Sequence, residues 1–251
     1  STARQAGPSM KPESPGERVD VTAFVDKVTA ELPEQIQRIS NLGKRYQVRE
    51  DSAYDVAQEE FDTRWQVVGW PRSIRQTIFS IEKTNSIERL HMIRDLRNSQ
   101  KLLEEKIFKL DGLTREVDQY RELEQAFAVG DRVRQIQGEL LEALEQAKVF
   151  DSHERLFGFK PSESLATIQK LVHDFDAQFK LWSTASSWVI PETAWLASPF
   201  TSLNASAMLQ AVATSRRTLA ALIKKFRGSK ENAFNVASKL RDKIEAFRAA
   251  A

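Results

Sequence analysis

The chain has 251 residues, of which 41% are hydrophobic, enough apolar material for a large folded core. Its 37 Lys and Arg nearly balance its 35 Asp and Glu, and it contains only 9 Gly and 8 Pro, a composition typical of long helices rather than of disorder. The lack of cysteine excludes disulfides and thiolate metal sites, and no apolar run approaches the roughly 20 residues that span a bilayer.

The first segment, residues 1–18, contains three prolines and no apolar period, which predicts a disordered leader or linker. A helix is predicted from Val21 to Gly43, with an interruption or kink at Pro33. A second helix is predicted from Asp51 to Val67, and Gly69-Trp70-Pro71 is expected to break the chain after it.

The longest apolar stripe of the sequence is best defined after residue 100. Its members are spaced by three and four residues, as on one face of a long helix that lies on other helices. The stripe consists of Leu103, Ile107, Leu110, Leu113, Val117, Tyr120, Leu123 and Phe127. We expect this helix to end at Gly130 and a further helix to reach Phe150.

The second half of the chain contains clearer breaks. The first is Gly158–Ser162, after which an aromatic stripe predicts a helix that Pro191 and Pro199 should stop. Two more helices are predicted after residue 200, the first of them capped by Asn204 or Ser206. Together these patterns predict an all-α fold built from elongated bundles of long antiparallel helices.

Chemistry-bearing motifs are sparse. No Gly-x-x-x-x-Gly-Lys-Ser/Thr loop occurs, so we predict no nucleotide site and no enzyme activity in this chain. His91, His153 and His173 are isolated, and we assign no catalytic residue, no cofactor and no metal. Residues 201–251 carry ten Lys and Arg against three Asp and Glu, but aromatic residues do not interleave with them in the way a groove for single-stranded nucleic acid requires, so a solvated helix face is favoured over a nucleic-acid site.

Three of the five tryptophans lie between Leu181 and Trp195, in the sequence LWSTASSWVIPETAW, and Ser198-Pro199-Phe200 follows at once. A Trp ring buries a large apolar area while its indole N–H still needs a partner. The cluster therefore predicts a place where several helices pack.

Several segments, in the same order, resemble the part of an axonemal dynein heavy chain where the tail ends and the linker begins. They are Ala147–Phe159 (AKVFDSHERLFGF), Leu165–Phe175 (LATIQKLVHDF), Leu181-Trp182 with Trp188, Trp195 and Pro199-Phe200, Leu203-Asn204-Ala205, and Val236–Phe247 (VASKLRDKIEAF). The likeness is good over residues 147–248, whereas residues 21–138 fit only as an expected helical bundle. Because the family continues beyond this point, the resemblance implies a piece of a longer heavy chain.

The resemblance implies a tail helical bundle at residues 19–150 and the start of the linker region at residues 151–251. It implies a non-catalytic mechanical segment that joins the tail to the linker, which transmits force from the ATPase ring of a microtubule motor. Trp182, Trp188, Trp195 and Phe200 are expected to lock the corner between the two parts as structural residues.

The implied partners are the remainder of the heavy chain, other dynein heavy, intermediate or light chains and, indirectly, the axonemal microtubule doublets. Neither nucleic acid nor a membrane is expected as a partner. The implied location is the cytoplasm and cytoskeleton, in the axoneme of a cilium or flagellum. The residues alone leave one alternative open, a free-standing helical scaffold or adaptor whose exposed stripe on Leu103–Phe127 pairs with a partner helix.

Overall fold

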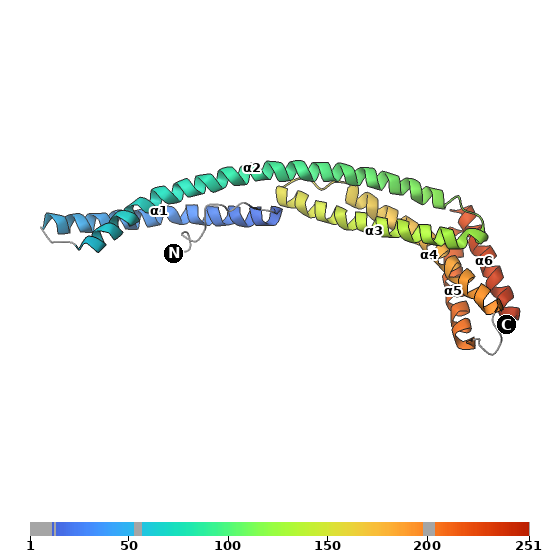
Figure 1. Cartoon of the computed structure of the whole chain (residues 1–251). Coiled ribbons are helices and arrows are strands. Elements are labelled where there is room, and N and C mark those ends of the chain that lie inside the picture. Colours follow the sequence, from blue (N-terminus) through green and yellow to red (C-terminus); the bar gives the residue numbers. More distant parts are fainter. Residues whose placement is uncertain (1–11, 13, 53–56, 198–203, 251) are drawn as a thin grey trace. The chain divides into compact units, whose positions relative to one another are not determined.

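The computed structural model describes residues 12, 14–52, 57–197 and 204–250. These residues form α1 (Pro15–Asp51), α2 (Gln58–Val117), a short 3-10 helix η2 (Leu123–Gln125), α3 (Ala126–Phe157), α4 (Ser164–Ala197), α5 (Ala205–Phe226) and α6 (Glu231–Ala250) (Figure 1). The described ranges contain no strand, so the all-α prediction is confirmed. None of the helices in these ranges is long and apolar enough to cross a membrane.

The chain forms two compact units, which are described separately. The first unit comprises Ser1–Asn98 and His153–Lys160, and the second comprises Ser99–Ser152 and Pro161–Ala251. This division differs from the boundary at 150/151 that the resemblance implies, because α2 and α3 each contribute residues to both units. The implied tail and linker segments therefore remain a prediction about function.

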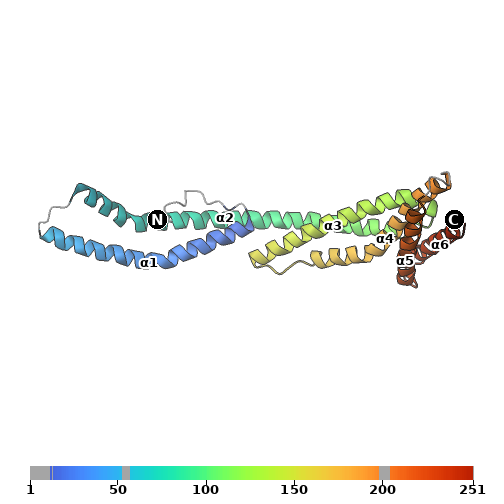
Figure 2. The same ribbon diagram turned by 90° about the horizontal axis from the view of Figure 1, so that it is seen from below.

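In the first unit, α1 and the first part of α2 form an antiparallel helical pair, visible in both views (Figures 1 and 2). Asn85 donates to the Thr22 hydroxyl at 2.9 Å near one end of the pair, and Tyr46 donates to Glu60 at 2.7 Å near the other. The α2 residues on the inner seam are partly buried and follow a four-and-three spacing, as in a coiled coil. They are Glu60, Arg64, Val67, Pro71, Ile74, Ile78, Ile81, Asn85, Glu88 and Met92.

Both helices of this pair run through the expected breaks. Helix α1 begins at Pro15, inside the predicted leader, and continues through Pro33, while α2 continues through Gly69-Trp70-Pro71. Proline in a helix interior costs about 3 kcal/mol because it removes a backbone hydrogen bond and crowds the preceding turn. The seam continues on both sides of each proline, and this packing outweighs the local cost.

The second unit contains the main hydrophobic core. Its large, fully buried side chains come from five helices and include Leu110 of α2, Ile136 of α3, Trp182 of α4, Leu219 of α5 and Leu240 of α6. Helices α4, α5 and α6 all contact one another, and α5 and α6 form a hairpin closed at Gly228, whose φ is 77°. Asn204 caps α5 as predicted, since its side chain accepts a bond from the Ala207 N–H at 3.1 Å.

Two helix ends in this unit were predicted wrongly. The long helix ends at Val117 rather than Gly130, and the chain reverses through η2 before α3 begins at Ala126. Gly130 lies inside α3, and Pro191 lies inside α4, which runs on to Ala197. A Cβ at Gly130 would lie 2.5 Å from the Ser186 Cβ, so this glycine permits close helix approach instead of ending a helix.

Candidate functional site

The organising element of the second unit is α4, which contributes buried side chains along most of its length. Phe175, Leu181, Trp182 and Trp188 are each no more than 2% exposed. Ile168, Phe175 and Trp182 follow one another every seven residues, so a single stripe of the helix faces the core. We call α4, together with the ends of α2, α5 and α6 that pack on it, the helix junction.

One half of the junction is an aromatic cluster between α4 and α6. The ring of Trp188 makes edge-to-face contacts with Trp195 and Phe247, at centroid distances of 5.8 and 5.4 Å. Trp195 and Phe247 also contact each other at 5.7 Å. Edge-to-face pairs add about 0.5–1.5 kcal/mol to the stabilisation from burial, so this cluster ties the C-terminal part of α4 to the last turns of α6.

Trp182 belongs to a separate part of the junction. Its ring contacts Tyr120, in the reversal between α2 and α3, edge to face at 6.1 Å. Trp182, Trp188 and Trp195 thus all join the second unit's core, but the structure places them in two separate aromatic groups rather than one. Phe200, the fourth residue of the predicted corner, lies outside the described residues. The role of these rings as a mechanical corner remains a prediction.

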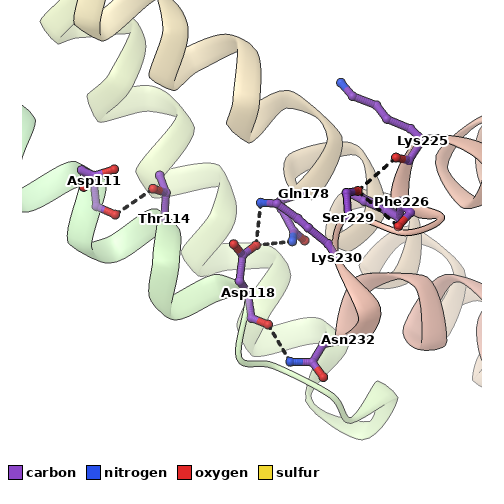
Figure 3. A network of polar contacts seen from close by, with 9 residues as sticks. All are labelled: Asp111, Thr114, Asp118, Gln178, Lys225, Phe226, Ser229, Lys230 and Asn232. Atoms are coloured by element: carbon purple, nitrogen blue, oxygen red, sulfur yellow. Dashed lines mark hydrogen bonds and ion pairs between the residues drawn. The ribbon is translucent and has the colours of Figure 1, made fainter.

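The other half of the junction is a polar network centred on Asp118, directly after the end of α2 (Figure 3). Its carboxylate accepts hydrogen bonds from the buried Gln178 amide of α4 and from Lys230, whose Nζ lies 2.8 Å away. The Asp118 carbonyl accepts a further bond from Asn232 at 3.0 Å. One residue therefore joins the chain reversal to α4 and to the start of α6.

Ion pairs add to the contacts of α6. Lys243 Nζ lies 2.7 Å from Glu192 Oε2 of α4, and the Glu192 side chain is only 7% exposed. Arg216 of α5 lies 2.6 Å from Glu245. Because a buried carboxylate is costly without a counter-charge, Lys243 fixes the position of α6 on α4.

The junction also contains a small crevice and its charged side chains. A crevice of about 330 Å³ beside Asp118 is lined by equal numbers of Asp and of Lys or Arg residues, and four of these form the pairs Arg115–Asp111 and Lys230–Asp118. Within the described ranges no three His, Cys, Asp or Glu side chains gather where they could hold a metal ion. His91 and His173 are exposed.

The first unit contains a second structured motif, the Leu-Phe-Gly turn that ends α3. Gly158 has φ 77°, and the Phe159 N–H returns to the Glu154 carbonyl at 2.8 Å, as in a Schellman cap. The guanidinium of Arg18 lies 5.6 Å from the centroid of the Phe157 ring, and the pKa of Arg18 is lowered by burial and by the nearby Arg89. The turn is thus packed against cationic side chains of its own unit.

Sequence reasoning identified the tryptophans but missed the Asp118 network. The partners of Asp118 are 60, 112 and 114 residues away along the chain, and no local pattern joins positions that distant. The only signal in the sequence is that Lys230 and Asn232 closely follow the glycine turn at Gly228.

No family model matches the chain. It is 24% identical over 246 residues to dynein axonemal heavy chain 1 of Mus musculus and of Homo sapiens, and this alignment covers 95% of the chain. The corresponding protein of Rattus norvegicus is 24% identical over 220 residues, or 84% of the chain. The chain spans only about 5–6% of the length of these relatives. The likeness supports a dynein-related segment.

Proposed function

We propose that the chain is a non-catalytic mechanical segment of an axonemal dynein heavy chain, with tail bundle at residues 19–150 and the start of the linker region at residues 151–251. The observation that carries this proposal is the likeness to dynein axonemal heavy chain 1, which extends over 95% of the chain. The Leu-Phe-Gly turn and the tryptophans of α4, on which the resemblance of the sequence rests, occupy ordered positions in the two units.

In this role the helix junction acts by stiffness. A helical segment transmits force efficiently when its core is densely packed and its helix ends are held in place. The aromatic cluster provides dense packing between α4 and α6, and the Asp118 network holds the end of α2 to α4 and α6. The ATPase ring that supplies the force lies outside these 251 residues, and we propose that this chain has no ATPase activity of its own. Its partners are then the rest of the heavy chain, other dynein subunits and, through them, axonemal microtubules.

The proposal is tested in the assembled motor. Trp188→Ala in the full heavy chain should reduce the velocity of microtubule gliding several-fold while leaving microtubule-stimulated ATP hydrolysis within about twofold of wild type. Phe108→Ala, which changes an 80% exposed ring, is the matched control and should alter neither. Equal loss of both activities in Trp188→Ala motors that assemble normally would count against a mechanical role.

The size of the native polypeptide tests membership in a heavy chain. An antibody to residues 160–200 should stain a band far larger than 28.6 kDa in axonemal extracts from the source organism, and high salt should release it with the dynein arms. A band near 29 kDa would instead favour a free-standing scaffold. That alternative loses its proposed docking stripe, because Leu103, Ile107, Leu110 and Val117 are buried in the chain's own core.

A further inference from the structure

Helix α2 carries a second stripe of side chains besides the seam that faces α1. The stripe consists of Phe61, Trp65, Val68, Arg72, Arg75 and Phe79, spaced by four, three, four, three and four residues, and all six are exposed. We call it the outer stripe. Its spacing is that of a helix-packing seam, and Trp65 and Phe79 are 59% and 69% exposed. Single exposed apolar residues are ordinary, but a row of large ones in register indicates a contact surface.

A crevice adjoins the outer stripe near the end of the helical pair. It has a volume of about 580 Å³ and is lined on α1 by Ile39, Leu42, Gly43 and Tyr46, and on α2 by Glu59, Glu60, Thr63, Arg64, Val67 and Val68. Val68 belongs to both the crevice and the stripe, and Leu42 is 47% exposed. Phe61 and Trp65 contact each other edge to face at 6.1 Å. The surface therefore offers both an apolar ridge and a recess for side chains.

The charge around this surface is mostly positive. Residues 35–49 of α1 and 63–81 of α2 contain seven Lys or Arg and no Asp or Glu. Arg38 and Arg49 pair with Glu34 and Glu60, but Arg72 and Arg75 form no hydrogen bond or ion pair with any described residue. Acidic residues flank these ranges: Glu59 and Glu60 line the crevice, Asp62 accepts a bond from Gln58, and Glu34 and Glu82 lie just outside the ranges at their other ends.

We propose that the outer stripe binds an acidic amphipathic helix of another polypeptide. Residues 61 and 79 are separated by roughly 27 Å along a helix, so the bound helix needs about 18 residues or more. Its apolar face packs on Phe61, Trp65, Val68 and Phe79, with one side chain entering the crevice, while its Asp or Glu side chains face Arg72 and Arg75. This surface goes beyond the proposed mechanical role and does not depend on it.

The observations favour this occupant over two others. A second copy of the chain docked through the same stripe would bring four Arg side chains and no carboxylate of the stripe into one interface, and this excess of like charge opposes binding. A nucleic acid would use the cations, but it would leave the aliphatic side chains of Leu42 and Val68 without a role.

The test uses the whole chain and three synthetic helical peptides of 25 residues, labelled with a fluorophore. The first has Leu on one face and Glu beside it, the second replaces Glu with Lys, and the third replaces Leu with Gln. Fluorescence anisotropy should show binding of the first peptide at least tenfold tighter than of the other two. Trp65→Ala should weaken that binding tenfold or more, and Arg72→Glu with Arg75→Glu should reverse the preference, so that the Lys peptide binds better.

Matched variants elsewhere on the chain keep the result specific. Phe108→Ala removes an aromatic ring that is 80% exposed and is the control for Trp65→Ala. Lys109→Glu with Lys170→Glu makes the same change of charge as the double Arg variant. Neither control should alter the affinity for the first peptide. Circular dichroism confirms that each variant is folded. Equal binding of all three peptides, or no reversal by the Arg variant, overturns the proposal. So does a dimer in sedimentation that Trp65→Ala dissociates, or competition by an oligonucleotide that Trp65→Ala abolishes.

Discussion

At the scale of single residues, the stability of the second unit depends on a few large rings. Trp188 is 1% exposed and contacts both Trp195 and Phe247. Trp188→Ala should lower the free energy of unfolding by about 3–5 kcal/mol, because the cavity cannot close around two neighbouring rings. Urea denaturation followed by circular dichroism measures this, with Trp65→Ala as the exposed counterpart that should cost less than about 1 kcal/mol. Similar costs for the two variants would contradict the burial pattern.

Asp118 is the second residue on which the junction depends. Asp118→Ala leaves the buried Gln178 amide and Lys230 without an acceptor, and we expect a loss of about 1–3 kcal/mol. Asp131→Ala is the control, because Asp131 pairs with Arg134 of its own helix and both side chains are about half exposed. It should change stability by less than about 0.5 kcal/mol in the same urea experiment. A larger effect at Asp131 than at Asp118 would sink this account of the network.

Tyr46 and Glu60 give the first unit a pH dependence. The hydrogen bond from the phenol raises the pKa of Tyr46 and lowers that of Glu60. The stability that Tyr46 contributes to the folded unit is present below the pKa of an unfolded tyrosine and is lost as the pH rises through the raised pKa. The stability that Glu60 contributes is instead lost as the pH falls through the lowered pKa. A carbon-13 NMR titration of the tyrosine rings should show Tyr46 ionising above its ordinary pKa, and Glu60→Gln should shift it back down. An unchanged titration in that variant would rule out the contact.

At the scale of elements, two glycines of α3 make a matched test of helix packing. A Cβ at Gly130 would meet the Ser186 Cβ at 2.5 Å and the Trp182 carbonyl oxygen at 3.3 Å, whereas Gly138 has open space. Gly130→Ala should therefore destabilise by about 1–3 kcal/mol through overpacking, and Gly138→Ala should stabilise by about 0.5–1 kcal/mol through helix propensity. Thermal unfolding of both variants checks the opposite signs. Two shifts in the same direction would mean that α3 and α4 are not in close contact.

The same elements show how far sequence reasoning reached. The spacing of apolar residues predicted helices, and four of the five residues of the stripe from Leu103 to Val117 are buried, while Leu113 is partly buried. Gly130, Pro71 and Pro191 were interpreted as helix breakers because local propensity penalises them, but a long packed seam outweighs one such penalty. The reversal after Val117 could not be predicted, because the contacts that fix Asp118 come from residues far along the chain.

At the scale of the whole molecule, the two units differ in how much apolar surface they bury. The buried core cluster draws its members from the second unit, whereas in the first unit the buried hydrophobic residues are Val25, Leu32, Leu96 and Phe157 among those described. Local stability follows buried contacts, so the first unit should open at a lower free energy than the second.

Hydrogen exchange detected by mass spectrometry tests this difference directly. Peptides from residues 15–51 and 58–98 should exchange faster than peptides from α3 residues 126–152 and from α4, and their protection should fall at lower urea concentration. Trp188→Ala should speed exchange in α4 and α6 more than in α1, because the ring lies in the second unit's core. If all helices lose protection together, at one urea concentration, the chain folds as a single cooperative body and the two-unit description fails.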